Sequence, residues 1–211
     1  ESKEMANQKE TSALILFFSV FFFLQWSVRS LQQTSNTLDL TYIKARCAAT
    51  QFPSVCYQSL HRYACDVRQD PGRLATAAMA LSLSRASSLS SYLHNVSSLY
   101  NLVADTIVPS ALQDCVSNVD DAVDEIKSSI KAFTDTLTST LDEFRFQMSN
   151  VQTWMSAALT DQETCTDGFQ DVNDWPQKTA LFEKVYKVKK LTSNALALVN
   201  DYAQSKAAKN Y

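Results

Sequence analysis

The chain has 211 residues, of which 45% are hydrophobic, and it carries a formal net charge of −3 at pH 7. It contains only two glycines and four prolines, too few for the turns of a β-rich protein or for glycine-rich phosphate loops. This composition favours one helical domain and excludes a Rossmann-type nucleotide-binding fold.

The first 30 residues have the pattern of a secretory signal peptide. Lys9 precedes the apolar run ALILFFSVFFFL at 13–24, and small residues follow at Ser27 and Ser30. The run is shorter than the roughly 20 residues that a stable membrane anchor requires. We therefore expect residues 1–30 to be cleaved and the mature, secreted domain to occupy residues 31–211.

The segment 37–63 predicts a helical hairpin at the start of the mature chain. Two short helical patterns are broken around Phe52 and Pro53, because a residue before proline is pushed out of helical geometry. Cys47 and Cys56 flank this break. A bridge between them would close a small loop and stabilise the hairpin by roughly 2.7 kcal/mol in a chain-entropy estimate.

Residues 70–204 predict four long amphipathic helices. The first follows Asp70-Pro71, an N-cap residue with proline at the first helical position. In all four, apolar residues recur at intervals of three and four. The helices are expected to begin near residues 71, 109, 140 and 178, and the third and fourth to end near Thr160 and Gln204. Short connections make neighbouring helices antiparallel, which predicts an up-down-up-down four-helix bundle.

The five cysteines are expected to pair in an oxidising compartment, leaving one thiol over. Their number alone leaves the pairing open. Cys115 lies at the start of the second long helix, and Cys165 is predicted just past the end of the third. An antiparallel pair places both at one end, where a bridge would close a loop of about 50 residues, worth about 4 kcal/mol. Asn95-Val96-Ser97 is a glycosylation sequon, usable in a secreted protein.

Charge is unevenly distributed along the chain. Residues 31–101 have a net charge of +3, residues 102–177 a net charge of −11, and residues 178–211 a net charge of +5. An acidic middle argues against nucleic-acid binding, which requires a basic surface. It suits a basic protein partner.

The sequence contains few candidate catalytic or metal-binding residues. His61 and His94 are the only histidines, and no nucleophile, phosphate-loop or zinc-protease motif accompanies them. The densest carboxylate cluster is interpreted mainly as a solvated acidic face, with a partner-binding face as the alternative: Asp120, Asp121, Asp124 and Glu125.

A calcium loop around Gly168 is also rejected, because it would place Cys165 at a ligand position and Asp174 at the position that requires glutamate. We expect no enzyme activity, no metal and no cofactor.

Four stretches, in this order, resemble the plant invertase and pectin methylesterase inhibitor family. They are CAATQFPSVCYQSL, ALQDCVSNVDDAVDEI, MSNVQTWMSAALTDQETCTDGF and LTSNALAL. The resemblance covers residues 38–202, essentially the whole mature chain. It implies a four-helix bundle with an N-terminal hairpin, bridges Cys47–Cys56 and Cys115–Cys165, and Cys65 as the free thiol.

The resemblance favours the pectin methylesterase side of this family. Members that resemble invertase inhibitors often carry a Pro-Lys-Phe tripeptide before the second cysteine of the long bridge, and this chain has FRFQMSNVQTW there instead. The chain ends at Tyr211, so we expect a stand-alone inhibitor rather than the pro-region of an esterase.

The function implied is a secreted inhibitor in the apoplast or cell wall, which covers the substrate cleft of a pectin methylesterase in a one-to-one complex. Inhibition of cell-wall or vacuolar invertase and a non-inhibitory helical binding protein remain alternatives. Arg145-Phe146 is the candidate anchor, with packing of Phe146 against a neighbouring helix end as the competing interpretation. The candidate partner-binding residues are Asp121, Asp124, Ser128, Arg145, Phe146, Gln147, Asn150 and Thr153.

Overall fold

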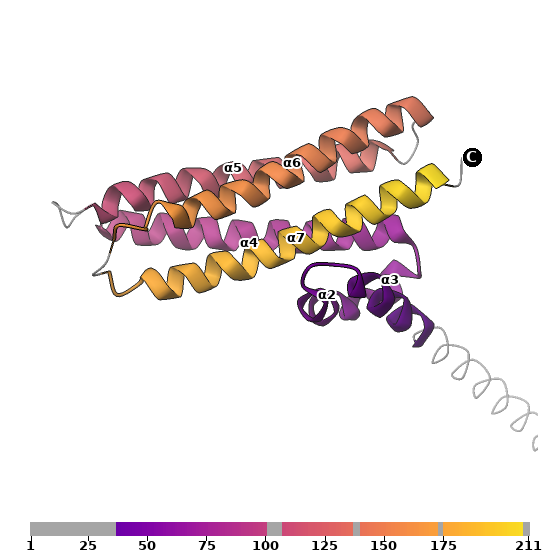
Figure 1. The fold of residues 1–211 in the computed structure, drawn as a ribbon, viewed down its shortest axis with the longest axis horizontal. Helices are drawn as coiled ribbons and strands as arrows, with labels where there is room; N and C mark the ends of the chain where they lie inside the picture. The colour runs from indigo at the N-terminus through magenta and orange to yellow at the C-terminus, as the bar shows by residue number, and fades with distance from the viewer. Residues whose placement is uncertain (1–36, 101–106, 137–139, 173–174, 209–211) are drawn as a thin grey trace, which may run out of the picture.

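A computed structural model describes residues 37–100, 107–136, 140–172 and 175–208. Across these ranges the chain is helical and contains no strand. Four long helices lie side by side, with a smaller helical segment against one end (Figure 1). The predicted bundle with an N-terminal hairpin and two disulfides is confirmed. The expected signal peptide lies outside the described residues. The long helices are α4 (Pro71–Tyr100), α5 (Val108–Asp135), α6 (Leu141–Asp167) and α7 (Lys178–Ala208).

The start of α4 follows the sequence prediction. Asp70 Oδ1 accepts a hydrogen bond from the Arg73 amide at 2.8 Å, and Pro71 is the first helical residue. Gly72 permits a close approach to α7, because a Cβ atom there would lie 3.1 Å from the Tyr202 ring. The first turn of α4 is therefore capped and packed tightly against the last turns of α7.

The third long helix continues well beyond its predicted end near Thr160. α6 begins with a capping box between Thr140 and Glu143 and ends at Asp167, so Cys165 lies inside its last turn and not after it. Gln162 is buried between Ala158 and Cys165 and continues the core face, although its polarity hides this in the sequence.

Gly168, which follows α6, has φ −59°, an ordinary helical value that does not require glycine.

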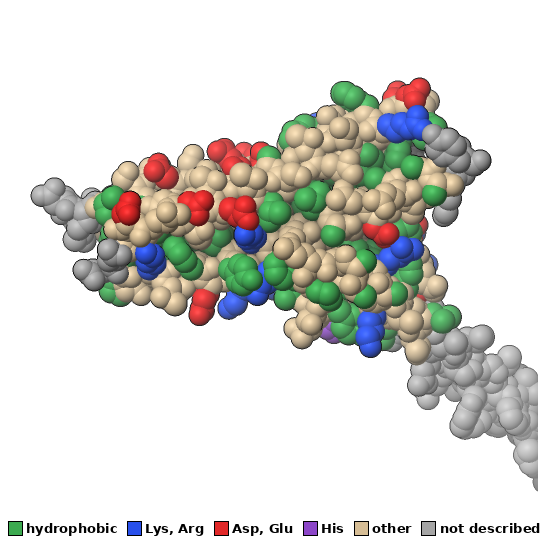
Figure 2. Space-filling model, viewed as in Figure 1, with side chains coloured by type: hydrophobic (Ala, Val, Ile, Leu, Met, Phe, Trp, Pro, Cys, Tyr) green, Lys and Arg blue, Asp and Glu red, His purple; other side chains and the backbone are tan. Residues whose placement is uncertain are grey.

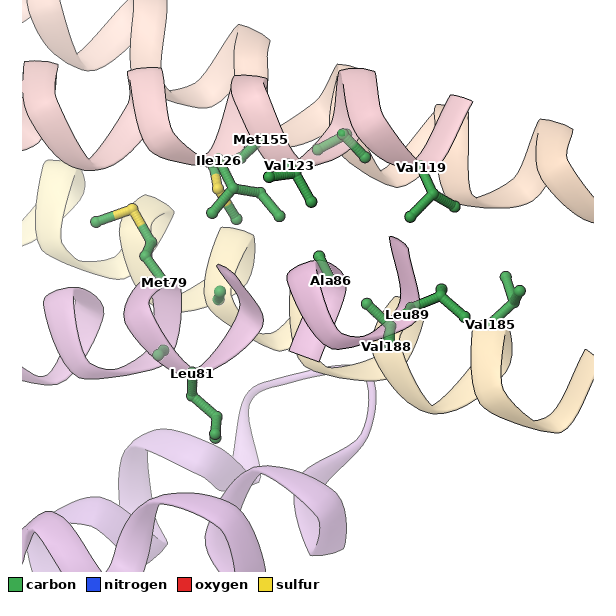
Figure 3. Packing of buried hydrophobic residues seen from close by; sticks show 14 of the residues in the cluster. Met79, Leu81, Ala86, Leu89, Val119, Val123, Ile126, Met155, Val185 and Val188 are labelled. Atoms are coloured by element: carbon green, nitrogen blue, oxygen red, sulfur yellow. The ribbon is translucent and has the colours of Figure 1, made fainter. Parts of the chain in front are cut away.

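The core of the bundle is built from mixed large and small apolar side chains. Figure 3 shows side chains of α4 and α5 meeting in the interior, joined by Met155 of α6 and by two valines of α7. Leu81 points the other way, from α4 toward the hairpin. Each fully buried side chain of this size contributes roughly 1.5–3 kcal/mol. A polar contact joins α4 to α7 across the core, between the Ser82 and Thr192 hydroxyls at 2.8 Å.

The hairpin consists of a helix at residues 37–48, α2 (Pro53–Leu60), the short helix η1 (His61–Tyr63) and α3 (Ala64–Val67). The Cys47–Cys56 disulfide closes its loop. Asn194 of α7 holds that loop, accepting from the Phe52 amide at 3.1 Å and donating to the Phe52 carbonyl at 3.0 Å. The hairpin is thus attached to α7 by hydrogen bonds between the Asn194 side chain and the Phe52 backbone, as well as by packing.

Candidate functional site

The register between α5 and α6 positions most of the candidate residues. The Cys115–Cys165 disulfide joins the first turns of α5 to the last turn of α6. About four turns further along α5, Ser129 Oγ donates to the Val151 carbonyl at 3.5 Å. These two pairs fix an antiparallel alignment in which Ser128 lies level with Gln152, one residue before Thr153.

The α5 residues of the set form one exposed stripe. Asp121, Asp124 and Ser128 are spaced by three and four residues, and all three are exposed. Asp124 accepts a hydrogen bond from Lys127 Nζ at 2.8 Å. Asp121 and Ser128 therefore offer polar groups to a partner, whereas Asp124 is partly neutralised by its ion pair.

The α6 residues Phe146, Asn150 and Thr153 also share one stripe, opposite the buried face of their helix. Phe146 is 65% exposed, in agreement with an outward-facing side chain and not with packing against a helix end. Gln147 is half-buried on the flank toward α5. Phe146, Gln147, Asn150 and Thr153 extend the α5 stripe of Asp121, Asp124 and Ser128 into one strip over two helices. We call this strip the acidic face.

The structure separates Arg145 from the other candidate partner-binding residues. It is on the same flank of α6 as Gln152, seven residues further on, whose side chain donates to Asn200 of α7 at 2.8 Å. Its guanidinium lies 3.6 Å from Asp142. Arg145 thus borders α7, on the opposite side of Phe146 from Gln147.

A pair of carboxyl groups, Glu125 of α5 and Asp161 of α6, lies within the acidic face. Glu125 Oε2 is buried, and burial raises the pKa of this carboxyl to about 7, with Asp161 and Asp121 adding to the rise. Burial also raises the pKa of Asp161, while its hydrogen bond with Glu125 opposes that rise. This arrangement fits a protonated Glu125 that donates to an ionised Asp161.

Sequence reasoning missed this pair. The sequence assigns Glu125 mainly to a solvated face, and Asp161 lies just past the predicted end of the third long helix near Thr160. The two residues are 36 positions apart, and only the antiparallel register of α5 and α6 makes them neighbours. The predicted Cys115–Cys165 bridge contained that register information, so the signal was present in the sequence.

Asp120 has a different environment from the neighbouring acids. It accepts from Ser90 Oγ at 2.5 Å and lies 2.9 Å from His94 Nε2, so it joins α5 to α4. This is not a catalytic triad, because Ser90 is bonded to the carboxylate and not to the imidazole. Within the described ranges, no group of three or more His, Cys, Asp or Glu side chains is arranged to hold a metal ion.

The remaining candidate positions lie on the surface. Asn95 is exposed near the end of α4, and its glycosylation stays a prediction. Cys65 is an exposed free thiol, and the other four cysteines are paired as the family resemblance implied. None of the helices in the described part of the chain has the length and apolar character needed to cross a membrane.

Comparisons with known proteins agree on one family. A family model described as "Plant invertase/pectin methylesterase inhibitor" matches residues 41–198. Pectinesterase inhibitor 10 of Arabidopsis thaliana is 40% identical over 171 residues, which is 81% of this chain and 54% of that protein. A 21 kDa protein of Daucus carota is 37% identical over 163 residues, covering 77% of this chain and 83% of its own length.

A solved structure supports the fold at lower identity. The crystal structure of a mutant form of a pectin methylesterase inhibitor from Arabidopsis matches with a TM-score of 0.58 and 19% identity. The match covers 73% of this chain and 92% of that one. The chain therefore shares its helical architecture with that protein.

Proposed function

Because the chain belongs to the plant invertase/pectin methylesterase inhibitor family, we propose that it is a secreted inhibitor of a pectin methylesterase. Pectinesterase inhibitor 10 supports this choice of target by its name. The structural observation that carries the proposal is Phe146, 65% exposed within a strip of polar and acidic side chains. A large exposed aromatic ring surrounded by polar groups is the usual composition of a protein-binding site.

The inhibitor acts by covering the substrate cleft of the esterase in a one-to-one complex. Phe146 enters the cleft region as the buried anchor, while Asn150 and Thr153 form the polar surroundings. Asp121 and the other acids of α5 attract a basic enzyme and orient it during approach. No bond is made or broken on the inhibitor itself, so its surface only has to be rigid and complementary.

The protein acts outside the cell, in the apoplast or cell wall. The expected signal peptide at residues 1–30 leads the chain into the secretory pathway. Two disulfides in a domain of this size are typical of an oxidising, extracellular environment.

The test mixes the purified mature chain, residues 31–211, with a basic plant pectin methylesterase and, separately, with an acid invertase. We expect esterase activity to fall until one equivalent of inhibitor is present, and invertase activity to stay unchanged. Inhibition of invertase alone would instead establish the alternative target within the family. Inhibition of neither enzyme at any ratio would contradict an inhibitory function.

A matched pair of variants tests the anchor. Phe146 and Leu99 have the same exposed fraction, 65%, but Leu99 lies on α4, away from the acidic face. We expect Phe146→Ala to weaken esterase inhibition by about tenfold or more, as truncation of a hot-spot residue does. Leu99→Ala serves as the control and should inhibit like the parent chain.

One observation favours a second candidate function, the binding of a small ligand. A mainly apolar hollow of about 480 Å³ lies between α6 and α7, a size suited to a small ligand. It is separate from the acidic face, so occupation of this hollow and inhibition of an esterase are compatible.

A further inference from the structure

A second surface of opposite charge runs along α7. This helix carries six lysines and two acidic residues, in contrast to the acidic α5 and α6. Figure 2 shows acidic side chains gathered over the upper helices and lysines interspersed with hydrophobic side chains over α7. The acidic face accounts for the proposed enzyme contact and leaves this basic surface without a role.

The centre of this surface is the hollow between α6 and α7. Phe182, Val185 and Tyr186 form its apolar wall, and Thr166 lines it from α6. Lysine side chains stand at both ends, Lys178 and Lys189. The hollow therefore combines aromatic rings, hydroxyl groups and cations, most of them from α7.

Aromatic rings and lysines continue beyond the hollow toward the hairpin. Tyr186 is 49% exposed, and its ring meets the ring of Phe52 edge-on at 6.2 Å. Lys190 Nζ lies 4.0 Å from the centre of the Tyr186 ring. From Lys178 to Lys190 the surface extends about 18 Å along the helix axis. We call Phe52, Lys178, Phe182, Tyr186, Lys189 and Lys190 the α7 groove.

A buried amide beneath this groove has no hydrogen-bond partner. Gln162 lines the hollow, is fully buried, and neither its Nε2 nor its Oε1 atom is hydrogen-bonded. An unsatisfied buried amide costs roughly 1–3 kcal/mol, so a native position of this kind calls for an explanation. A ligand with hydroxyl groups could supply both a donor and an acceptor after a small rotation of the Gln162 side chain.

These features define the chemistry of the occupant. The exposed Tyr186 ring and the half-buried Phe52 and Phe182 rings offer apolar surface to the faces of sugar rings. The Gln162 amide and the threonine hydroxyls beside it suit sugar hydroxyl groups. The lysines require negative charge, but Lys189 is ion-paired with Glu163, and Glu183 also lines the hollow. The net positive charge is therefore modest, which fits widely spaced carboxylates better than the dense phosphates of nucleic acid.

We propose that the α7 groove binds an acidic polysaccharide, a chain of linked uronic acid residues. This goes beyond inhibition of an esterase, because it gives the inhibitor a second, simultaneous attachment to a polysaccharide matrix. The acidic face on α5 and α6 stays free for the enzyme while the α7 groove holds the polymer.

Binding is tested by titrating the mature chain with an oligomer of α-1,4-linked galacturonic acid in a calorimeter. The comparison probes are the same oligomer with its carboxyls methyl-esterified, a neutral galactose oligomer, and poly-glutamate. We expect binding of the free uronate oligomer that weakens as salt rises, with much weaker binding of the esterified and neutral forms. Equal binding of poly-glutamate would overturn the proposal, because it would indicate unspecific attraction of polyanions or an acidic protein partner. Absence of uronate binding at low salt would also overturn it.

Variants locate the site. We expect Tyr186→Ala and Lys190→Gln each to reduce the affinity for the uronate oligomer by about fivefold. Lys131→Gln on α5 removes the same charge elsewhere, and Phe146→Ala removes an exposed ring elsewhere, so neither should change this affinity. Unchanged circular dichroism and melting temperature establish that the variants are folded.

Esterase inhibition separates this proposal from the proposed function. Inhibition should be unaffected in Tyr186→Ala and Lys190→Gln, and a loss of inhibition there would place the α7 groove in the enzyme contact and refute a separate site. Uronate binding that persists in a chain that inhibits no esterase would support the groove while contradicting the inhibitor function.

Discussion

The α5–α6 pair and the α7–hairpin pair, here called the two halves, both pack against α4 and are each held together by different means. A disulfide links α5 to α6, and the outer surface of that pair is acidic with one exposed aromatic ring. α7 is linked to the hairpin by side-chain hydrogen bonds from Asn194, and its outer surface is basic with several aromatic rings. The difference teaches that a helical bundle can present two surfaces of opposite charge on one rigid core.

The largest expected effect concerns the two disulfides. Replacing Cys115 and Cys165 by alanine should lower the free energy of unfolding by about 4 kcal/mol, since this bridge spans 50 residues. Replacing Cys47 and Cys56 should cost about 2.7 kcal/mol, because that bridge spans 9 residues. Urea unfolding measures both, and Cys65→Ser, at the exposed free thiol, is the control, expected within about 0.5 kcal/mol of the parent. An equal loss for both bridges would remove this distinction between the two halves.

The attachment of the hairpin to α7 is tested by Asn194→Ala. The substitution removes both side-chain hydrogen bonds to the Phe52 backbone, and we expect a loss of about 2 kcal/mol in the free energy of unfolding. Faster hydrogen exchange at the Phe52 amide would locate the effect in the hairpin loop. The control is Asn150→Ala on the acidic face, whose effect on stability should be much smaller. Unchanged exchange at Phe52 would show that the Asn194 hydrogen bonds are not needed to hold the loop.

The carboxyl pair predicts a pH dependence that belongs to the α5–α6 half. The pKa of Glu125 is raised from an ordinary 4.5 to about 7, so the folded protein binds more protons than the unfolded chain between these values. Stability is therefore greatest at low pH in this window and declines as pH rises through about 7. Glu125→Gln should reduce this pH-dependent loss in the free energy of unfolding by about 1 kcal/mol. The expected value is small because the carboxyl pair is partly solvated.

Thermal unfolding of the parent and the variant at several pH values between 4.5 and 7 measures this effect. Asp124→Asn is the control, because Asp124 is exposed and ion-paired with Lys127. A parent protein whose stability rises with pH across this window would contradict the assignment.

The smallest expected effect is on the rate of association with the enzyme. Asp121→Asn removes one exposed charge from the acidic face, so we expect association with a basic esterase to slow by about twofold at low salt. The difference should vanish at high salt, and the free energy of unfolding should change by less than about 0.5 kcal/mol. Stopped-flow mixing follows the rate, and an unchanged rate at low salt would argue against electrostatic steering by α5.

Much of the fold was predictable because its signals are local. The spacing of apolar residues and the Asp70-Pro71 start determined the helices and their order, and short connections determined their direction. The end of α6 was missed because Gln162 interrupts an apolar pattern while occupying a core position. A polar residue in such a position cannot be recognised as buried without knowledge of what covers it.

The candidate site was only partly predictable, because it depends on how helices face one another. The outward stripe of Phe146, Asn150 and Thr153 follows from helical periodicity alone. The Glu125–Asp161 pair requires the register across two helices, and the separation of Arg145 from Gln147 requires knowing which flank of α6 faces α7. The α7 groove requires two further elements, since Phe52 comes from the hairpin and Gln162, beneath the groove, comes from α6.

The Cys115–Cys165 bridge also determines what a protease can do to this protein. Any single cut in the 50-residue segment between the two cysteines leaves both fragments covalently joined. α5 and α6 would remain side by side after such a nick, with the core contacts between them still in place. For the proposed extracellular inhibitor, one cut within the proposed binding region would thus leave a single covalent molecule.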